Sequence, residues 1–155
     1  MSRTLVLALG NRLSGADAFG PAVLDQLRQT GVPSGVEAIE AGTDLLRHTD
    51  RFAQYDSVVL VDAVVGDGMR GIDTIPERTF ARWDRRSRSA HELSAVGCVE
   101  LFRTLQPPDK GGRPVIVLVA LVTPEEDFGR APTQPEIDAA VAAVYLASCW
   151  NAGTK

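Results

Sequence analysis

Three polar side chains lie where one predicted element gives way to the next, and together they could bind a metal ion. Asp17 follows a glycine-containing loop, Asp62 closes the apolar run 58–61, and His91 precedes an amphipathic segment. If the strands of the sheet are parallel, their carboxyl ends share one edge, and all three residues can converge there. Two carboxylates and one imidazole form a partial ligand shell for a borderline divalent cation, with positions left open.

Each of these residues also has an ordinary structural explanation. Asp17 can be the N-cap of a helix, Asp62 can be a solvated acid at a strand end, and His91 can occupy the first turn of a helix. Spacing alone therefore leaves two alternatives, which are a metal site and three unrelated structural residues.

The elements that must position these side chains alternate between strand and helix. Apolar runs predict strands at residues 4–9, 36–39, 57–61, 72–75 and 115–121. Apolar periodicity predicts helices at residues 17–30, 45–52, 89–105 and 133–144. Two S/T-x-x-E capping boxes, Ser89–Glu92 and Thr133–Glu136, are expected to begin the last two helices, and the basic stretch 78–88 is expected to be a loop.

These patterns predict one domain over residues 1–155, because no repeat or low-complexity linker divides the chain. The fold class expected is α/β, a three-layer α/β/α sandwich of the phosphorylase/hydrolase-like kind. Its sheet should be twisted and mostly parallel, with about five strands.

Composition narrows the range of partners. A net charge of −4 and a pI near 5.1 make nucleic acid a poor expectation. The longest apolar run, residues 115–122, is far shorter than the ~20 residues needed to span a bilayer, so no membrane association is expected. Cys98 and Cys149 are expected to be buried free thiols in a cytoplasmic protein.

Several familiar motifs are absent from the sequence. Glycines at positions 10, 15 and 20 match neither a dinucleotide fingerprint nor a phosphate-binding loop, so Glu40 is more simply a solvated strand-end acid. His91-Glu92 begins an H-E-x-x-H zinc motif, but position 95 is alanine. There is also no G-x-S-x-G nucleophile elbow.

Nearly the whole chain resembles the hydrogenase maturation endopeptidases, which process the large subunit of [NiFe] hydrogenases. The similarity includes a Gly-Asn segment running into an acidic D-[DE]-x-x-G element, a G-G-T turn, a strand ending in aspartate, an S-x-H-[ED] element and an S-x-E-[VI] helix. The matching segments are LALGNRLSGADAFG (7–20), AGT with the following leucines (41–46), VVLVDA (58–63), SAHEL (89–93), and LVTPE with the last helix (121–125 and 133–141).

The resemblance implies roles for individual residues. The metal-contacting and catalytic positions of the family fall on Asp17, Asp62 and His91, and Gly42 matches a turn glycine near that site. The sequence departs from the family at two positions, where Ala16 replaces an acid and Ala41 replaces the first glycine of the G-G-T turn. Neither change removes a proposed ligand.

The resemblance further implies an aspartic-type, metal-dependent endopeptidase that acts on the [NiFe] hydrogenase large-subunit precursor. It would remove the C-terminal peptide after nickel insertion. Either the trio binds its own metal ion, which activates water, or it contacts nickel that the precursor supplies. We favour the second interpretation. No organic cofactor is expected, and the protein is expected to be monomeric.

Two other functions remain as alternatives. A non-catalytic metallochaperone that binds the precursor would be consistent with Ala16. A peptidyl-tRNA hydrolase-like esterase has a similar opening strand and turn, but it needs an early catalytic histidine. His48 lies outside any matching motif, and the acidic pI disfavours an RNA conjugate.

Overall fold

A computed structural model of the chain describes residues 2–83, 94–106 and 114–150. Within these residues, five strands form a single sheet in the order β2-β1-β3-β5-β4. The strands are β1 (Thr4–Leu9), β2 (Val36–Gly42), β3 (Ser57–Val65), β4 (Gly71–Pro76) and β5 (Val115–Thr123). Strands β2, β1, β3 and β5 are parallel to one another, and β4 is antiparallel to β5. The predicted mostly parallel sheet is confirmed.

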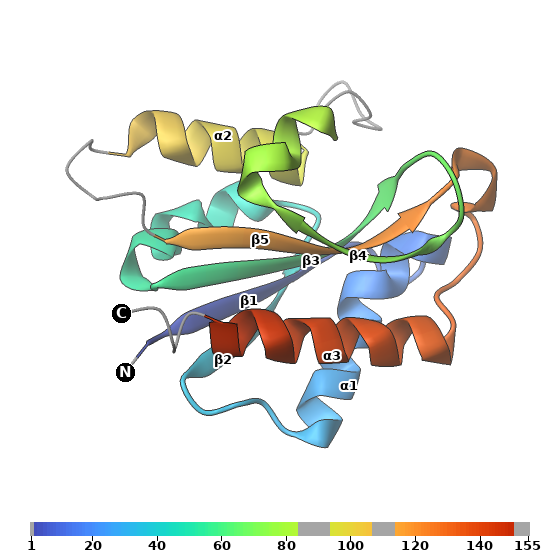
Figure 1. Cartoon of the computed structure of the whole chain (residues 1–155), viewed down its shortest axis with the longest axis horizontal. Helices are drawn as coiled ribbons and strands as arrows, with labels where there is room; N and C mark the ends of the chain where they lie inside the picture. The colour runs from blue at the N-terminus through green and yellow to red at the C-terminus, as the bar shows by residue number, and fades with distance from the viewer. Residues whose placement is uncertain (1, 84–93, 107–113, 151–155) are drawn as a thin grey trace.

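Helices cover both faces of this sheet (Figure 1). One face carries α1 (Phe19–Thr30) and α3 (Gln134–Trp150), which pack against each other. The other face carries α2 (Ala95–Leu105) and the 3₁₀ helix η2 (Leu45–Gln54), which are also in contact. Shorter 3₁₀ helices are η1 (Gly15–Ala18), η3 (Glu77–Arg82) and η6 (Glu125–Asp127). The α/β/α sandwich is therefore confirmed.

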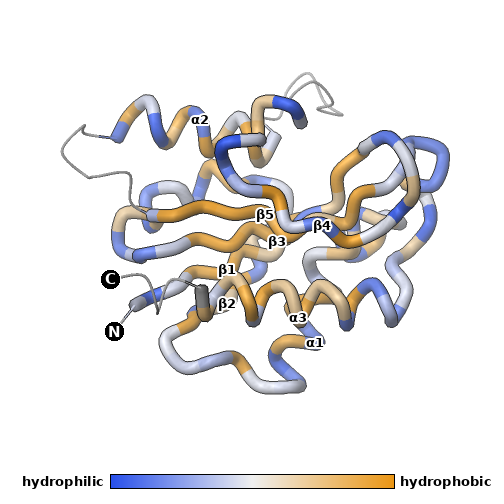
Figure 2. The backbone as a smooth tube through the Cα atoms, viewed as in Figure 1, coloured by the Kyte–Doolittle hydropathy of each residue, from blue (hydrophilic) through white to orange (hydrophobic). Residues whose placement is uncertain are grey.

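The central strands are apolar because both of their faces are covered. Leu5 and Leu7 of β1 point into the core under α2 and η2, while Val6 points into the core under α1 and α3. Figure 2 shows the result as nearly continuous hydrophobic colour along β3 and β5. These continuous runs are the reason that the sequence predicts the central strands well.

Predicted boundaries are wrong or incomplete at β2, in the stretch 78–88 and at α2. Strand β2 continues to Gly42, beyond the predicted end at residue 39. The stretch 78–88 is not wholly a loop, because η3 covers residues 77–82 and buries Phe80. Helix α2 begins at Ala95, where Ser94 is the N-cap and accepts a hydrogen bond from the Gly97 N–H at 3.0 Å. The predicted start at Ser89 is therefore too early.

Other predictions for single residues have mixed outcomes. The Thr133–Glu136 capping box is confirmed, since Thr133 Oγ1 accepts from the Glu136 N–H at 3.4 Å and Glu136 Oε1 accepts from the Thr133 N–H at 3.4 Å. Cys98 is buried as expected, whereas Cys149 is exposed and the prediction of burial there is wrong. In the described part of the chain, no helix has the length and apolar character to cross a membrane.

Candidate functional site

Asp62 does not end its strand, contrary to the sequence prediction. Strand β3 continues to Val65, and Asp62 lies opposite Ala120 of β5. However, β1 pairs with β3 only as far as the Ala8–Val61 match. Asp62 is therefore the first residue of β3 that has no partner in β1. It lies beside the point where β1 ends and the loop toward η1 begins. By the alternation of the strand, it shares the sheet face of Leu60, on the side of α2 and η2.

Asp17 lies in η1, directly after the loop that follows β1. It is not a helix N-cap, because Ser14 occupies that position in η1 and Ala18 occupies it in α1. Its Oδ2 accepts the backbone N–H of Asn11 at 3.1 Å, so the carboxylate folds back over the end of β1.

Gly10 makes this fold-back possible. Its φ is +123°, and a Cβ added there would lie 2.0 Å from the backbone oxygen of Asp17 and 3.3 Å from Oδ1. No side chain fits at such separations, and L-residues rarely adopt that φ. Glycine at this position therefore lets Asp17 lie against the end of β1.

The charges of the two aspartates act on each other. Burial, followed by the negative charge of Asp17, raises the pKa of Asp62 to about 7, and the Ala63 N–H opposes this shift by donating to Oδ1 at 2.9 Å. Both side chains are half-buried. Among the described residues, neither carboxylate forms an ion pair with lysine or arginine. A cation bound between them would relieve this repulsion.

Two further glycines bring backbones together around the site. A Cβ on Gly20 would lie 2.1 Å from Leu9 O and 2.8 Å from Val61 O, so α1 starts directly on the end of β1 and against Val61 within β3. A Cβ on Gly15 would lie 2.7 Å from Gly129 O. The five-residue spacing of Gly10, Gly15 and Gly20 matches neither a dinucleotide fingerprint nor a phosphate-binding loop. Their actual role in close packing was missed.

Gly42 closes the site on the side of β2. It lies opposite Leu9 with a φ of +65°, and its carbonyl accepts the Gly10 N–H at 2.9 Å. The backbone role suggested for this glycine is consistent with that geometry. Ala41, which replaces the first glycine of the family turn, is buried at 8% exposure and belongs to the core under α2.

Ala16, the second departure from the family pattern, is completely buried. It is 0% exposed and packs with Phe19 and Phe128 in the core under α1 and α3. That is the sheet face opposite to the one that Asp62 shares. A carboxylate at this position would be placed in apolar surroundings and would need a partner there.

Arg12 braces the loop that contains Asn11. Its guanidinium pairs with Asp25 of α1 at 2.7 Å and with Glu40 of β2 at 2.7 Å, in both cases through two hydrogen bonds. Glu40 is exposed as predicted, but it lies within β2 and not at its end, and it pairs with Arg12.

His91 lies outside the described residues, as do Ser89 and Glu92. Its convergence with Asp17 and Asp62 therefore stays a prediction. Within residues 2–83, 94–106 and 114–150, no group of three or more His, Cys, Asp or Glu side chains could hold a metal ion. Asp17 and Asp62 are thus the part of the predicted trio that the structure brings together.

Comparison with known proteins gives a consistent result. No protein-family model matches the sequence, and no curated protein matches it. Among solved structures, the chain is similar to the hydrogenase maturating endopeptidase HybD from E. coli, with 25% identity, a TM-score of 0.73, and coverage of 97% of this chain and 94% of that one. This structural likeness supports the resemblance to the hydrogenase maturation endopeptidases.

A second structure supports the same assignment. The [NiFe] hydrogenase maturation protease HybD from Thermococcus kodakarensis has 25% identity and a TM-score of 0.69, with 94% of this chain and 99% of that chain covered. HycI from the same organism, at 21% identity and a TM-score of 0.66, shares the fold over 95% of this chain and 90% of its own. The likeness therefore includes the whole maturation endopeptidase domain, and the resemblance predicted from the sequence is confirmed.

Proposed function

We propose that this protein is an endopeptidase that removes the C-terminal peptide from the large-subunit precursor of a [NiFe] hydrogenase after nickel insertion. The observation that carries the proposal is the whole-chain likeness to two maturation endopeptidases at 25% identity. The carboxylates of Asp17 and Asp62 support it, because their charges act on each other and neither has a cationic partner among the described residues, an arrangement suited to a metal ion.

In this proposal, Asp17, Asp62 and His91 contact nickel carried by the precursor. Carboxylate oxygen and imidazole nitrogen are suitable ligands for such a cation. A positive charge would favour the ionised form of Asp62, whose pKa burial and Asp17 raise to about 7. Docking of a nickel-loaded precursor would thus be favoured over docking of a nickel-free one.

Asp62 would also serve in proton transfer. With the nickel-loaded precursor docked, the ionised carboxylate of Asp62 would accept a proton from the attacking water and return it to the leaving amine. This role fits an aspartic-type endopeptidase whose reactive geometry is completed by the substrate. We further propose that the protein acts in the cytoplasm as a monomer, without an organic cofactor.

The non-catalytic metallochaperone is not favoured by the structure. Its best support was Ala16, read as a lost acid beside Asp17. Ala16 packs into the core under α1 and α3, so alanine there is explained by burial.

The experiment that tests the function uses purified protein with nickel-loaded and nickel-free precursor. Chelator-washed enzyme should cleave the loaded precursor, giving a mass loss at its C-terminus, and should leave the nickel-free precursor intact. Metal analysis should find no stoichiometric ion in the isolated enzyme. Equal cleavage of both precursors, or tightly bound zinc, would instead indicate a protease with its own metal.

A further inference from the structure

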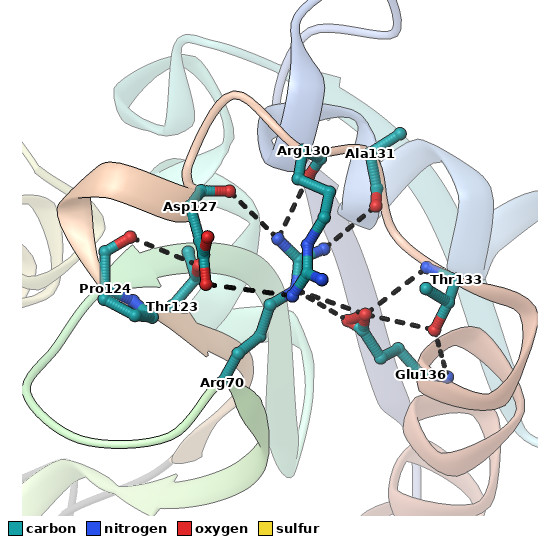
Figure 3. A network of polar contacts seen from close by, with 8 residues as sticks. All are labelled: Arg70, Thr123, Pro124, Asp127, Arg130, Ala131, Thr133 and Glu136. Atoms are coloured by element: carbon teal, nitrogen blue, oxygen red, sulfur yellow. Dashed lines mark hydrogen bonds and ion pairs between the residues drawn. The ribbon is translucent and has the colours of Figure 1, made fainter.

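Arg70 is a nearly buried arginine whose donors all point at one loop and one helix (Figure 3). Its side chain is only 5% exposed. Nε donates to the carboxylate of Glu136 at 3.0 Å, Nη1 donates to Asp127 O at 3.1 Å and to Arg130 O at 3.0 Å, and Nη2 donates to Ala131 O at 3.0 Å. One guanidinium thereby holds three backbone carbonyls of residues 127–131.

Glu136 is itself held rigidly in this cluster. Its Oε1 accepts from Thr133 Oγ1 at 3.0 Å, within the capping box of α3. Burial alone would raise the pKa of Glu136, but hydrogen bonds from Arg70 and Thr133 outweigh burial and hold that pKa below its ordinary value. The carboxylate is therefore ionised and fixed at neutral pH.

The loop that Arg70 holds is in direct backbone contact with η1. Phe128 O accepts the N–H of Ala16 at 2.9 Å. Gly15 lies so close to the loop that an added Cβ would be 2.8 Å from Phe128 O and 2.7 Å from Gly129 O. Asp17 is the next residue after Ala16, so the position of the loop sets the position of Asp17.

Arg70 is also connected to Asp62. It lies in the turn between β3 and β4, which follows the strand that carries Asp62. This turn is fixed at its start by Gly66, whose N–H donates to Thr123 O of β5 at 3.0 Å. A single side chain thus ties the segment after Asp62 to the segment that supports Asp17.

We propose that Arg70 is a positioning residue that sets Asp17 against Asp62 by clamping residues 127–131 under η1. Its effect on cleavage rests on the proposed function, whereas its effect on η1 does not. The role requires the planar fork of arginine, because a lysine ammonium keeps the charge but cannot reach a carboxylate and three carbonyls from fixed directions.

Arg103 provides a matched control at the other end of the sheet. It lies in α2, pairs with Glu77 at 2.7 Å, and donates to Pro114 O just before β5 begins. Arg103 is therefore a second partly buried arginine that joins a carboxylate to a backbone carbonyl. It does so at the amino end of β5, which is the opposite end of that strand from the candidate site. Arg103→Lys therefore shows how amide exchange and cleavage respond when a partly buried arginine is replaced at a place where it does not contact η1.

The test measures amide hydrogen exchange and precursor cleavage in Arg70→Lys and Arg103→Lys. In Arg70→Lys, the Ala16 amide should exchange at least about tenfold faster relative to the Val59 amide in the core strand. The kcat should fall by roughly 10–100-fold with KM within about threefold, since small misplacement of a reacting group costs rate more than binding. Arg103→Lys should leave both quantities at the wild-type values.

The contrary outcomes are distinct. Unchanged exchange at Ala16 in Arg70→Lys, an equal change in Arg103→Lys, or faster exchange with an unchanged kcat would overturn the positioning role. If the wild-type protein cleaves no precursor, the proposed function fails while the Ala16 exchange still decides the clamp. If Arg70→Lys does not fold, Glu136→Gln, which keeps the guanidinium, should increase Ala16 exchange in the same direction, and no increase would overturn the proposal.

Discussion

Asp62 and Glu136 are two shielded acids that lie in contrasting environments. Glu136 receives hydrogen bonds from Arg70 and Thr133, and these outweigh burial to lower its pKa. Among the described residues, the Ala63 N–H is the one hydrogen bond that Asp62 receives against burial and the charge of Asp17, and its pKa rises to about 7. Burial acts in the same direction on both groups, so the partner decides the sign of the shift.

The difference separates a structural acid from a candidate functional one. A paired, hydrogen-bonded carboxylate stabilises the fold at neutral pH, whereas two facing carboxylates destabilise it. Unfavourable ionisation of this kind is common where a protein binds a cation or moves protons. Three predictions test this contrast.

The largest effect is expected on cleavage, at the acid pair. Asp17→Asn and His91→Ala should each lower the rate of precursor cleavage by more than about 100-fold. Residues that only support a metal ligand typically cost up to about 100-fold when they are lost, and a residue that contacts the metal directly should cost more. Circular dichroism should show the wild-type fold, because Asp17 is half-buried and contributes no ion pair within the described residues. Cleavage by His91→Ala at the wild-type rate would remove that residue from the site.

A smaller effect is expected on stability at Glu136. Glu136→Gln should lower the free energy of unfolding at pH 7 by about 1–3 kcal/mol, because the buried Arg70 loses its counter-charge. Since the folded pKa of Glu136 is lowered, its contribution is present above the unfolded pKa and lost as pH falls. Denaturant unfolding at pH 7 and pH 3 should therefore show the deficit shrinking in acid. A deficit independent of pH would contradict the ionised pairing.

The smallest effect has the opposite sign, at Asp62. Its folded pKa lies above the unfolded value of 3.8, so the folded state loses stability as pH rises from about 4 through about 7. Asp62→Asn avoids this loss and should raise the free energy of unfolding by about 1–2 kcal/mol at pH 8, after allowance for partial exposure. Near pH 4 the two proteins should be equally stable. A destabilised variant at pH 8 would show that the Asp17–Asp62 repulsion is compensated.

The sequence predicts the sheet well because buried parallel strands are continuous apolar runs. The sequence fails where a polar residue interrupts such a run, because Asp62 predicts the end of a strand that in fact continues to Val65. The start of α2 was misplaced because Ser89–Glu92 satisfies a local capping pattern, whereas the actual cap, Ser94, has no glutamate three residues later.

The candidate site was predictable in part. Asp17 and Asp62 stood out because acids at the carboxyl ends of parallel strands share one edge. Arg70 could not be found in this way. Its partners lie 57 to 66 residues further along the chain, and three of the four are backbone carbonyls, which carry no residue-type signal.

The strand order has a consequence for synthesis of the chain. Strand β5 lies between β3 and β4, so β4 leaves the ribosome before the strand it must pair with exists. The groups that hold Arg70, and the Phe128 carbonyl that anchors Ala16, are made later still. A nascent chain can assemble β1, β2 and β3 around α1 while η1 still lacks its support. Under the proposed clamp by Arg70, the two aspartates are set against each other only after α3 docks, so a helix translated after β5 completes the positioning of the loop that follows β1.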